Sequence, residues 1–164
     1  MAKKEEKTNV MRVLEQKQIP YTAHAYPADG PTDGVSVANC LGQDVEQVFK
    51  TLVTKAASGT YYVFDIPVAE NLDLKKAAKA VGEKSIAMIP QKELLPLTGY
   101  VHGGCSPVGM KKQFPTVFHE TAELFDTICV SGGKIGAQVE LPPLMLLELL
   151  RADTADLIVE ESKV

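Results

Sequence analysis

The sequence predicts a mixed α/β fold, in which a mixed β-sheet or barrel-like sheet forms the core and helices lie at its periphery. Two observations lead to this prediction. Short segments rich in β-branched and aromatic residues recur along the chain, and segments with apolar residues at helical spacing are interspersed with them. No repeat, linker or change of composition divides the 164 residues, so we expect one domain over residues 1–164.

The expected strands are short runs of β-branched and aromatic residues bounded by turn-forming residues. They are residues 21–26, 50–56, 61–68, 86–89, 116–119, 127–130, 137–141 and 157–159. Ser58 and Gly59 lie between the second and third of these strands and predict a hairpin. We expect the last strand, residues 157–159, to lie at a sheet edge.

The expected helices are bounded by residues that commonly begin or end helices. They are residues 8–18, 35–41, 74–81 and 144–151, with shorter helical turns at 45–49 and 90–95. Asp73 is placed as an N-terminal cap of the third helix and Gly82 as its C-terminal cap. The charged residues 1–7 are predicted to be flexible.

Composition narrows the class of protein. Cys40, Cys105 and Cys129 are odd in number and scattered, which indicates a reducing compartment and disfavours a disulfide framework or a cysteine zinc site. We see no signal peptide and no apolar run of transmembrane length, so we expect a cytoplasmic protein with no membrane partner. The formal net charge of −4 means that any contact with nucleic acid requires a local basic patch.

The most distinctive segment spans residues 100–112 and is rich in glycine. Gly103 and Gly104 allow positive φ and close approach of another molecule, while Pro107 stiffens the turn. Lys111 and Lys112 add positive charge just downstream. A rigid loop that offers main-chain N–H groups beside cations suits an anion or a carbonyl group. An ordinary surface turn with solvated lysines is an equally good interpretation.

Lys50 is the second candidate, because it lies between apolar neighbours on an expected strand. Its charge is costly there unless the side chain faces a pocket or an anion. The alternative is a lysine whose aliphatic stem packs while its ammonium group reaches water.

The motifs of common hydrolases and nucleotide-binding proteins are absent from the sequence. There is no G-x-S-x-G, P-loop, H-E-x-x-H or C-x-x-C, and the histidines are dispersed, so no metal site is predicted. His102 and Cys105 lie close enough in sequence to form a thiol–imidazole pair, which keeps a cysteine hydrolase open as a hypothesis. A small buried core residue is the commoner role of such a cysteine.

Several of these segments occur together in a known family. Residues 48–53, 72–80, 98–100, 103–112 and 130–134 follow one another as in the YbaK/EbsC proteins, which the chain resembles over nearly its whole length. These proteins are free-standing relatives of the editing domain of bacterial prolyl-tRNA synthetases. Among them the chain is most similar to the Cys-tRNA(Pro) deacylases.

The resemblance implies a mixed, barrel-like α/β domain that hydrolyses mischarged aminoacyl-tRNA without a cofactor. Lys50 matches the family's essential lysine, and Gly103 to Pro107 match its G-x-x-x-P loop. The other positions that the resemblance assigns to the substrate site are Tyr26, Gly104, Ser106, Ser131, Gly132 and Gly133. Asp33 and Gln138 depart from the family where the pocket is lined, so the amino acid removed stays open.

A mechanism without a protein nucleophile follows from these residues. An aminoacyl ester is already activated, so orientation and oxyanion stabilisation supply much of the rate. We expect the N–H groups of Gly103 and Gly104 to hold the carbonyl oxygen and Lys50 to bind the terminal phosphate or ribose. In the route that the resemblance implies, the attacking group is the substrate's own thiol if the amino acid is cysteine. Otherwise a positioned water attacks.

The expected partners follow from the same resemblance. We expect the acceptor end of an aminoacyl-tRNA as substrate, with lysines outside the pocket as contacts for the acceptor stem, and prolyl-tRNA synthetase as a protein that delivers it. These lysines are Lys111, Lys112 and Lys134. Two alternatives stay open, a deacylase for another small amino acid and a module that binds tRNA or the synthetase without chemistry.

Overall fold

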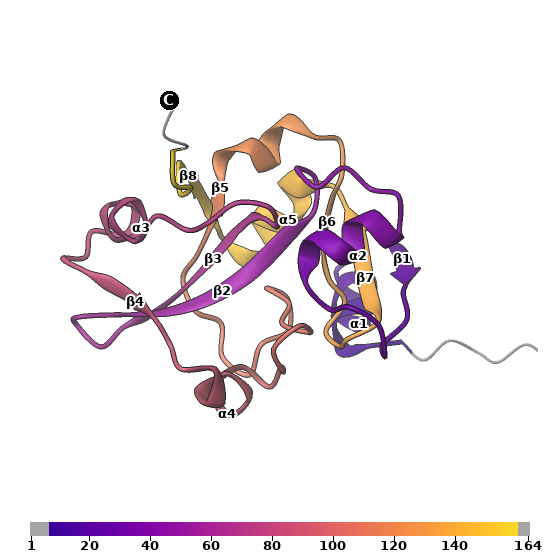
Figure 1. Cartoon of the computed structure of the whole chain (residues 1–164), viewed down its shortest axis with the longest axis horizontal. Helices are drawn as coiled ribbons and strands as arrows, with labels where there is room; N and C mark the ends of the chain where they lie inside the picture. Colours follow the sequence, from indigo (N-terminus) through magenta and orange to yellow (C-terminus); the bar gives the residue numbers. More distant parts are fainter. Residues whose placement is uncertain (1–6, 161–164) are drawn as a thin grey trace, which may run out of the picture.

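Two β-sheets form the frame of the computed structural model, which describes residues 7–160 (Figure 1). The larger sheet has the strand order β4-β2-β3-β5-β8, and the smaller sheet has the order β1-β7-β6. The strands are β1 (Thr22–Ala25), β2 (Phe49–Ala56), β3 (Tyr61–Pro67), β4 (Ile86–Met88), β5 (Thr116–His119), β6 (Ile128–Ser131), β7 (Ala137–Leu141) and β8 (Asp153–Ala155). In the larger sheet β3–β5 and β5–β8 are parallel pairs, so the predicted mixed sheet is confirmed.

The two sheets meet just before β2. Val48 forms a parallel bridge with Cys129 of β6, and the Cys129 N–H donates to the carbonyl of Gln47 at 3.0 Å. The predicted mixed or barrel-like sheet is thus realised as two sheets joined at one end. This junction brings the start of β2 next to the ends of β6 and β7.

β2 and β3 form the predicted hairpin. Lys50 pairs with Ile66 and Thr51 pairs with Asp65 across the antiparallel ladder. Because side chains alternate between the faces of a strand, Thr51 lies on one face of the sheet and Lys50 on the other.

Helices lie around the two sheets. They are α1 (Asn9–Gln16), α2 (Gly34–Cys40), α3 (Leu74–Val81), α4 (Leu94–Thr98) and α5 (Pro143–Leu150), with the 3₁₀ turns η1 (Gln91–Glu93) and η2 (Glu120–Leu124). The predicted caps of α3 are confirmed, since Asp73 accepts from two backbone N–H groups and Gly82 has a φ of +72°. In the same way Asp33 begins α2.

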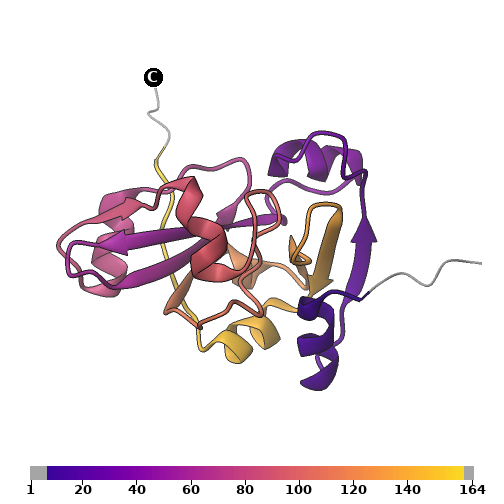
Figure 2. The same cartoon turned by 90° about the horizontal axis from the view of Figure 1, so that it is seen from below.

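Two main cores hold these elements together. The first lies between the sheets and is closed by α1 and α5, where Leu14 and Leu146 are fully buried. Figure 2 shows α1, in indigo, and α5, in yellow-orange, along the same lower side of the molecule. The second core packs Phe64 and Ile66 of β3 against α3. Thr51 therefore lies on the face of the first core and Lys50 on the face of the second.

The edge strand predicted at residues 157–159 is realised only as an isolated bridge. Ile158 pairs antiparallel with Leu72, and the Val159 N–H donates to the Asn71 carbonyl at 3.0 Å. The edge strand of the larger sheet is β8, Asp153–Ala155, which pairs with β5 shortly after Arg151, the C-terminal cap of α5. Leu157 is fully buried, and its N–H donates to Nδ1 of His119 at 3.1 Å.

Smaller differences concern the ends of elements. The turn predicted at 45–49 ends before Phe49, which begins β2, and the turn predicted at 90–95 continues through α4 to Thr98. The prediction of flexibility for residues 1–7 lies outside the described residues except for Lys7, whose Nζ donates to Glu15 at 2.6 Å. No helix within residues 7–160 has the length and apolar character needed to cross a membrane.

The buried His119 makes the packing of the C-terminal segment sensitive to pH. Its Nδ1 accepts a hydrogen bond, so the ring is neutral, and burial lowers its pKa. The unfolded chain therefore takes up the proton at a higher pH than the folded chain, and folding stability falls as pH drops below the ordinary histidine range. We expect urea unfolding at pH 7.5 and 5.5 to show this loss in the wild type and a smaller loss in His119→Asn. Equal losses in the two proteins would contradict the role of His119.

Candidate active site

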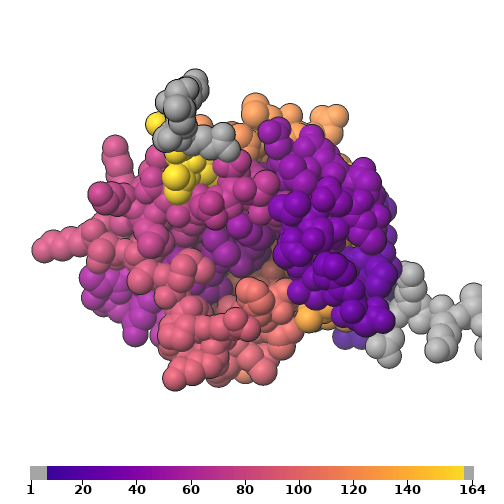
Figure 3. All heavy atoms as spheres, viewed as in Figure 1, coloured from indigo at the N-terminus to yellow at the C-terminus, as the bar shows by residue number. Residues whose placement is uncertain are grey.

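A pocket of about 440 Å³ lies where the start of β2 meets the segment that leads into α2. Its other walls come from the connection between β4 and α4, the glycine-rich loop after α4, and the facing ends of β6 and β7. Figure 3 shows the surface hollowed between the N-terminal residues, in indigo and violet, and the rose-coloured residues around α4. The volume is that of a pocket for a small ligand.

Lys50 lines this pocket without a partner for its charge. Within residues 7–160 its ammonium group makes no hydrogen bond and no ion pair at 4.0 Å or less. Burial lowers the pKa of Lys50, and the negative charge of Glu70 partly opposes this effect. A partly desolvated ammonium group of this kind gains from binding an anionic ligand.

Gly103 also lines the pocket, and Gly104 does not. The N–H of Gly104 donates to the carbonyl of Val101 at 2.9 Å and closes a turn. The N–H of Gly103 has no hydrogen-bond acceptor in the described part of the chain. Of the two N–H groups expected to hold a carbonyl oxygen, the structure leaves that of Gly103 unengaged.

Gly104 instead allows the glycine-rich loop after α4 to contact a second glycine-rich loop, the connection between β6 and β7. A Cβ atom at this position would lie 3.0 Å from the Lys134 Cα and the Ile135 N. Ser106 and Pro107 are buried beneath the loop, and Ser106 Oγ accepts from the Val108 N–H at 3.2 Å. These three predicted site residues therefore support the loop and do not reach the pocket.

In the second glycine-rich loop, too, some predicted site residues line the pocket and others do not. Ser131 lines the pocket, and its Oγ accepts from the Gly133 N–H at 3.1 Å. The Gly132 N–H donates to Ala137 at 2.8 Å across the loop. Gly133 has a φ of +97° and packs against Val10 of the first core. Ser131 is thus the member of this group that reaches the pocket.

The residues expected at the amino-acid pocket form another wall of the site. Tyr26, Asp33 and Gln138 all line the pocket. Asp33 caps α2 through the Ser36 N–H at 3.1 Å, and this bond lowers the pKa of its carboxyl group. Gln138 is 3% exposed, and its amide exchanges hydrogen bonds with that of Gln43 at 2.6 and 3.1 Å. This wall therefore combines one exposed carboxylate with a neutral, paired amide.

Comparison with known proteins assigns the family. The family model described as "Aminoacyl-tRNA editing domain" matches residues 32–149. The chain belongs to this family. A candidate Cys-tRNA(Pro)/Cys-tRNA(Cys) deacylase, EbsC of Enterococcus faecalis, is 44% identical over 164 residues, which cover 98% of this editing domain and 100% of that protein. The resemblance seen in the sequence is thereby confirmed.

Solved structures share the fold of this editing domain. The crystal structure of a candidate trans-editing enzyme for prolyl-tRNA synthetase has a TM-score of 0.79 at 29% identity, over 92% of this chain and 95% of that chain. A hypothetical protein has a TM-score of 0.84 at 22% identity, over 92% of this chain and 99% of that chain, and this likeness supports the fold alone. The predicted mixed α/β fold is confirmed.

The lysines expected to contact tRNA lie outside the pocket of the editing domain. Lys111, Lys112 and Lys134 are all exposed, and the Lys111 ammonium reaches the Pro96 carbonyl at 3.5 Å. Lys134 neighbours the contact between the two loops. Their role as acceptor-stem contacts stays a prediction.

The thiol of Cys105 is not activated for nucleophilic attack. It lines the pocket, but burial and then the charge of Asp65 raise its pKa to about 12. His102 also lines the pocket, and no hydrogen bond joins it to Cys105 within residues 7–160. The hypothesis of a cysteine hydrolase loses its support, because the thiolate is the nucleophilic form.

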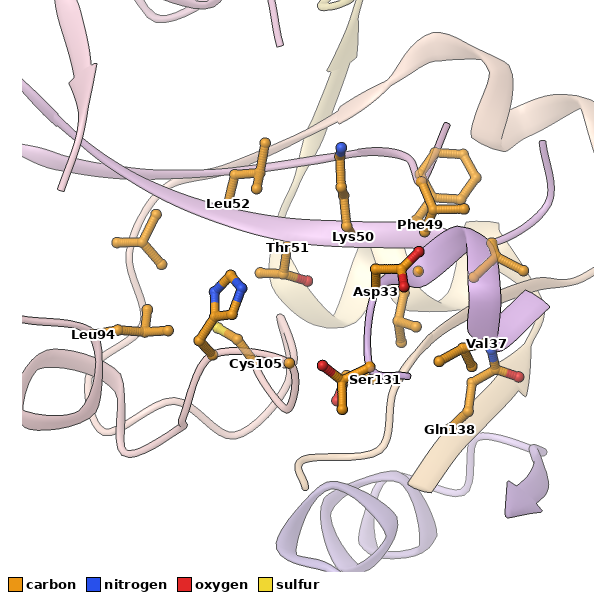
Figure 4. A pocket seen from close by; sticks show the side chains of 18 of the residues that line it. Asp33, Val37, Phe49, Lys50, Thr51, Leu52, Leu94, Cys105, Ser131 and Gln138 are labelled. Atoms are coloured by element: carbon orange, nitrogen blue, oxygen red, sulfur yellow. The ribbon is translucent and has the colours of Figure 1, made fainter. Parts of the chain in front are cut away.

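Sequence reasoning missed a polar pair beside the pocket. Thr51 lines the pocket (Figure 4). Its Oγ1 shares a hydrogen bond of 2.5 Å with Oδ1 of the fully buried Asp65. The available signal was a carboxyl group inside the apolar run of β3. Among the described residues no cluster of three or more His, Cys, Asp or Glu side chains is placed to hold a metal ion.

The close packing of Gly133 makes a prediction about stability. Gly133→Ala places a methyl group 2.8 Å from Val10 Cγ2 on a residue with positive φ. Gly42→Ala is the matched control, because Gly42 also has positive φ and has nothing within 4 Å of the added Cβ. We expect Gly133→Ala to lower the free energy of unfolding by about 1–3 kcal/mol more than the control, measured by urea unfolding. Equal losses would contradict a packing role for Gly133.

Proposed function

We propose that this editing domain hydrolyses the ester bond of cysteine wrongly attached to tRNA, with Cys-tRNA(Pro) as the main substrate. One observation carries the proposal. Lys50, whose ammonium group has no partner within residues 7–160, and Gly103, whose N–H has no acceptor there, both line this pocket. The similarity to a candidate Cys-tRNA(Pro)/Cys-tRNA(Cys) deacylase over the whole chain supports the choice of substrate.

The two groups act on different parts of the substrate. Figure 4 shows the Lys50 side chain leaving β2 on the side away from Cys105 and the glycine-rich loop. Lys50 therefore binds the terminal phosphate or ribose, while the Gly103 N–H donates to the carbonyl oxygen of the aminoacyl ester. Holding both ends fixes the ester in one orientation, and the hydrogen bond strengthens as negative charge develops on that oxygen.

The substrate thiol or a water molecule supplies the attacking group. In the first route the sulfur bonds to the carbonyl carbon, the bond from that carbon to the ribose oxygen breaks, and the thiol proton passes to the ribose oxygen. Water then opens the resulting thiolactone to free cysteine. In the second route water attacks the same carbon directly and supplies the proton to the ribose oxygen. Neither route needs a nucleophilic side chain, in agreement with the protonated thiol of Cys105.

The partners follow from the same proposal. Lys111, Lys112 and Lys134 contact the phosphates of the acceptor stem, and prolyl-tRNA synthetase delivers the mischarged tRNA. Mild acidity of the whole chain makes tight unaided binding of tRNA unfavourable. The site of action is the cytoplasm, where aminoacyl-tRNA is made and used.

Lys50→Ala tests the electrostatic part of the mechanism. We expect the rate of cysteine release from Cys-tRNA(Pro) to fall by at least ~10²-fold, the scale lost with one stabilising group. Lys55→Ala is the matched control, because Lys55 is an exposed lysine on the same strand that does not line the pocket. Turnover by Lys50→Ala close to that of the wild type would remove Lys50 from the mechanism.

A panel of Cys-, Ser-, Ala- and Pro-tRNA tests the amino acid. We expect cysteine to be released fastest, and Ser-tRNA to be cleaved far more slowly because a hydroxyl group is a poorer nucleophile than a thiol. Faster release of alanine or proline would replace the substrate assignment and exclude thiol assistance. Intact ester for all four substrates, together with a stable complex on a sizing column, would identify a binding module without chemistry.

A further inference from the structure

Asp65 is a buried carboxyl group with an incomplete set of partners. It is 0% exposed, and within residues 7–160 its Oδ1 bonds to Thr51 while its Oδ2 has no hydrogen-bond partner. No lysine, arginine or histidine forms an ion pair with it in the same region. A carboxylate without a cation or a second donor is costly in such a place, so the neutral acid is the favoured form.

The surroundings of Asp65 reinforce its neutral form. Burial raises its pKa to about 8, and the bond from Thr51 only partly opposes this effect. Opposite it, β2 contributes Thr51, and β5 contributes the apolar Phe118. The loop contributes the thiol of Cys105, with Tyr100 beside it, and the pKa of each is raised to about 12. The titratable groups that face Asp65 are therefore uncharged near neutral pH.

The protonation state of Asp65 decides which way the Thr51 hydroxyl points. An ionised Asp65 takes the single Thr51 proton, and Thr51 can then only accept a hydrogen bond in the pocket. A carboxylic acid protonated on Oδ1 donates to Thr51 Oγ1 and leaves the Thr51 proton free. The bare Oδ2 fits this second arrangement, because it is then a carbonyl-type oxygen, and a buried acceptor without a partner costs less than a buried donor.

Thr51 is well placed to use that free proton. Figure 4 shows its side chain on the side of β2 that faces Cys105 and the glycine-rich loop, opposite to Lys50. Gly103, whose N–H has no acceptor within residues 7–160, lines the same pocket, and the Gly104 N–H is engaged by Val101. One of the two main-chain donors expected from the sequence is therefore taken, and oxyanion sites usually have two donors.

We propose that Asp65 is a positioning residue of the editing reaction, which donates to Thr51 and thereby turns the Thr51 hydroxyl proton into the pocket as the second donor to the ester carbonyl oxygen. This inference rests on the proposed deacylase function. It adds a side-chain donor backed by a buried acid to the N–H of Gly103. Lys50, on the other face of β2, keeps its separate role with the phosphate or ribose.

Deacylation of Cys-tRNA(Pro) under single-turnover conditions from pH 6.5 to 9 tests the inference. The proteins are wild type, Thr51→Val, Thr51→Ser, Asp65→Asn and the double variant Thr51→Val/Asp65→Asn. Spontaneous hydrolysis is subtracted at each pH. Thr54→Val is the matched control, because Thr54 is a buried threonine of the same strand, bonded to the Tyr62 carbonyl, that does not line the pocket.

The expected result has two parts. Thr51→Val loses at least ~10-fold in rate at pH 7, and Thr54→Val stays near the wild type. Thr51→Ser, which keeps the hydroxyl group, recovers most of the rate that Thr51→Val loses. Above about pH 8 Asp65 ionises and recaptures the Thr51 proton, so the rate of the wild type falls relative to that of Asp65→Asn. The same relative fall in rate above about pH 8 occurs in Thr51→Ser and is missing in Thr51→Val. In the double variant, Asp65→Asn has no further effect on the rate of Thr51→Val.

Three outcomes overturn the inference. The first is a Thr51→Val protein that cleaves at the wild-type rate. The second is a wild-type pH profile that coincides with that of Asp65→Asn, or, if that variant does not fold, with that of Thr51→Val. In both cases cleavage by the wild type leaves the proposed function standing. The third is an intact ester with the wild type at every pH, which overturns the proposed function and this inference together.

Discussion

The register between β2 and β3 is the constraint on which the site depends. Neighbouring side chains of a strand leave it on opposite faces, so Lys50 and Thr51 serve two different walls although they are adjacent in sequence. A slip of one residue would exchange these faces and bury the ammonium group in the first core. Val63 and Ile66, each fully buried in a different core, hold the register by packing. The separate positions of Lys50 and Thr51 at the site are thus a consequence of how the hairpin packs.

Contact between two loops sets the other half of the site. Gly104 lies so close to the backbone of Lys134 that a side chain at this position would separate the loops. The turn that allows this approach uses the Gly104 N–H for its own hydrogen bond and leaves that of Gly103 free. Because the Gly104 N–H is engaged, a further group is needed beside the Gly103 N–H to stabilise an oxyanion well, and the position of Thr51 on the facing strand meets that need.

Features that depend on local chemistry could be predicted from the sequence. The caps Asp73 and Gly82 act within one turn, and the hairpin follows from a short connection between two strands. The edge strand of the larger sheet could not be placed, because β5 pairs with Asp153–Ala155, whereas residues 157–159 pair with the segment before α3. Lys50 was recognisable as a charge in an apolar strand. Asp65 carries the same signal, but its meaning depends on the register that places it opposite Thr51.

The burial of Asp65 has no explanation in stability. An apolar residue of similar size would fill the same space in β3 without leaving an oxygen unpaired, and such replacements of buried polar groups are often neutral or stabilising. Proteins retain destabilising groups where activity requires them. A carboxyl group in water is ionised at neutral pH and cannot donate, whereas burial keeps this one protonated and makes it a donor. The desolvation that weakens the fold at this point is thus what orients the Thr51 proton, and the site gains a directed donor without placing a charge in the core.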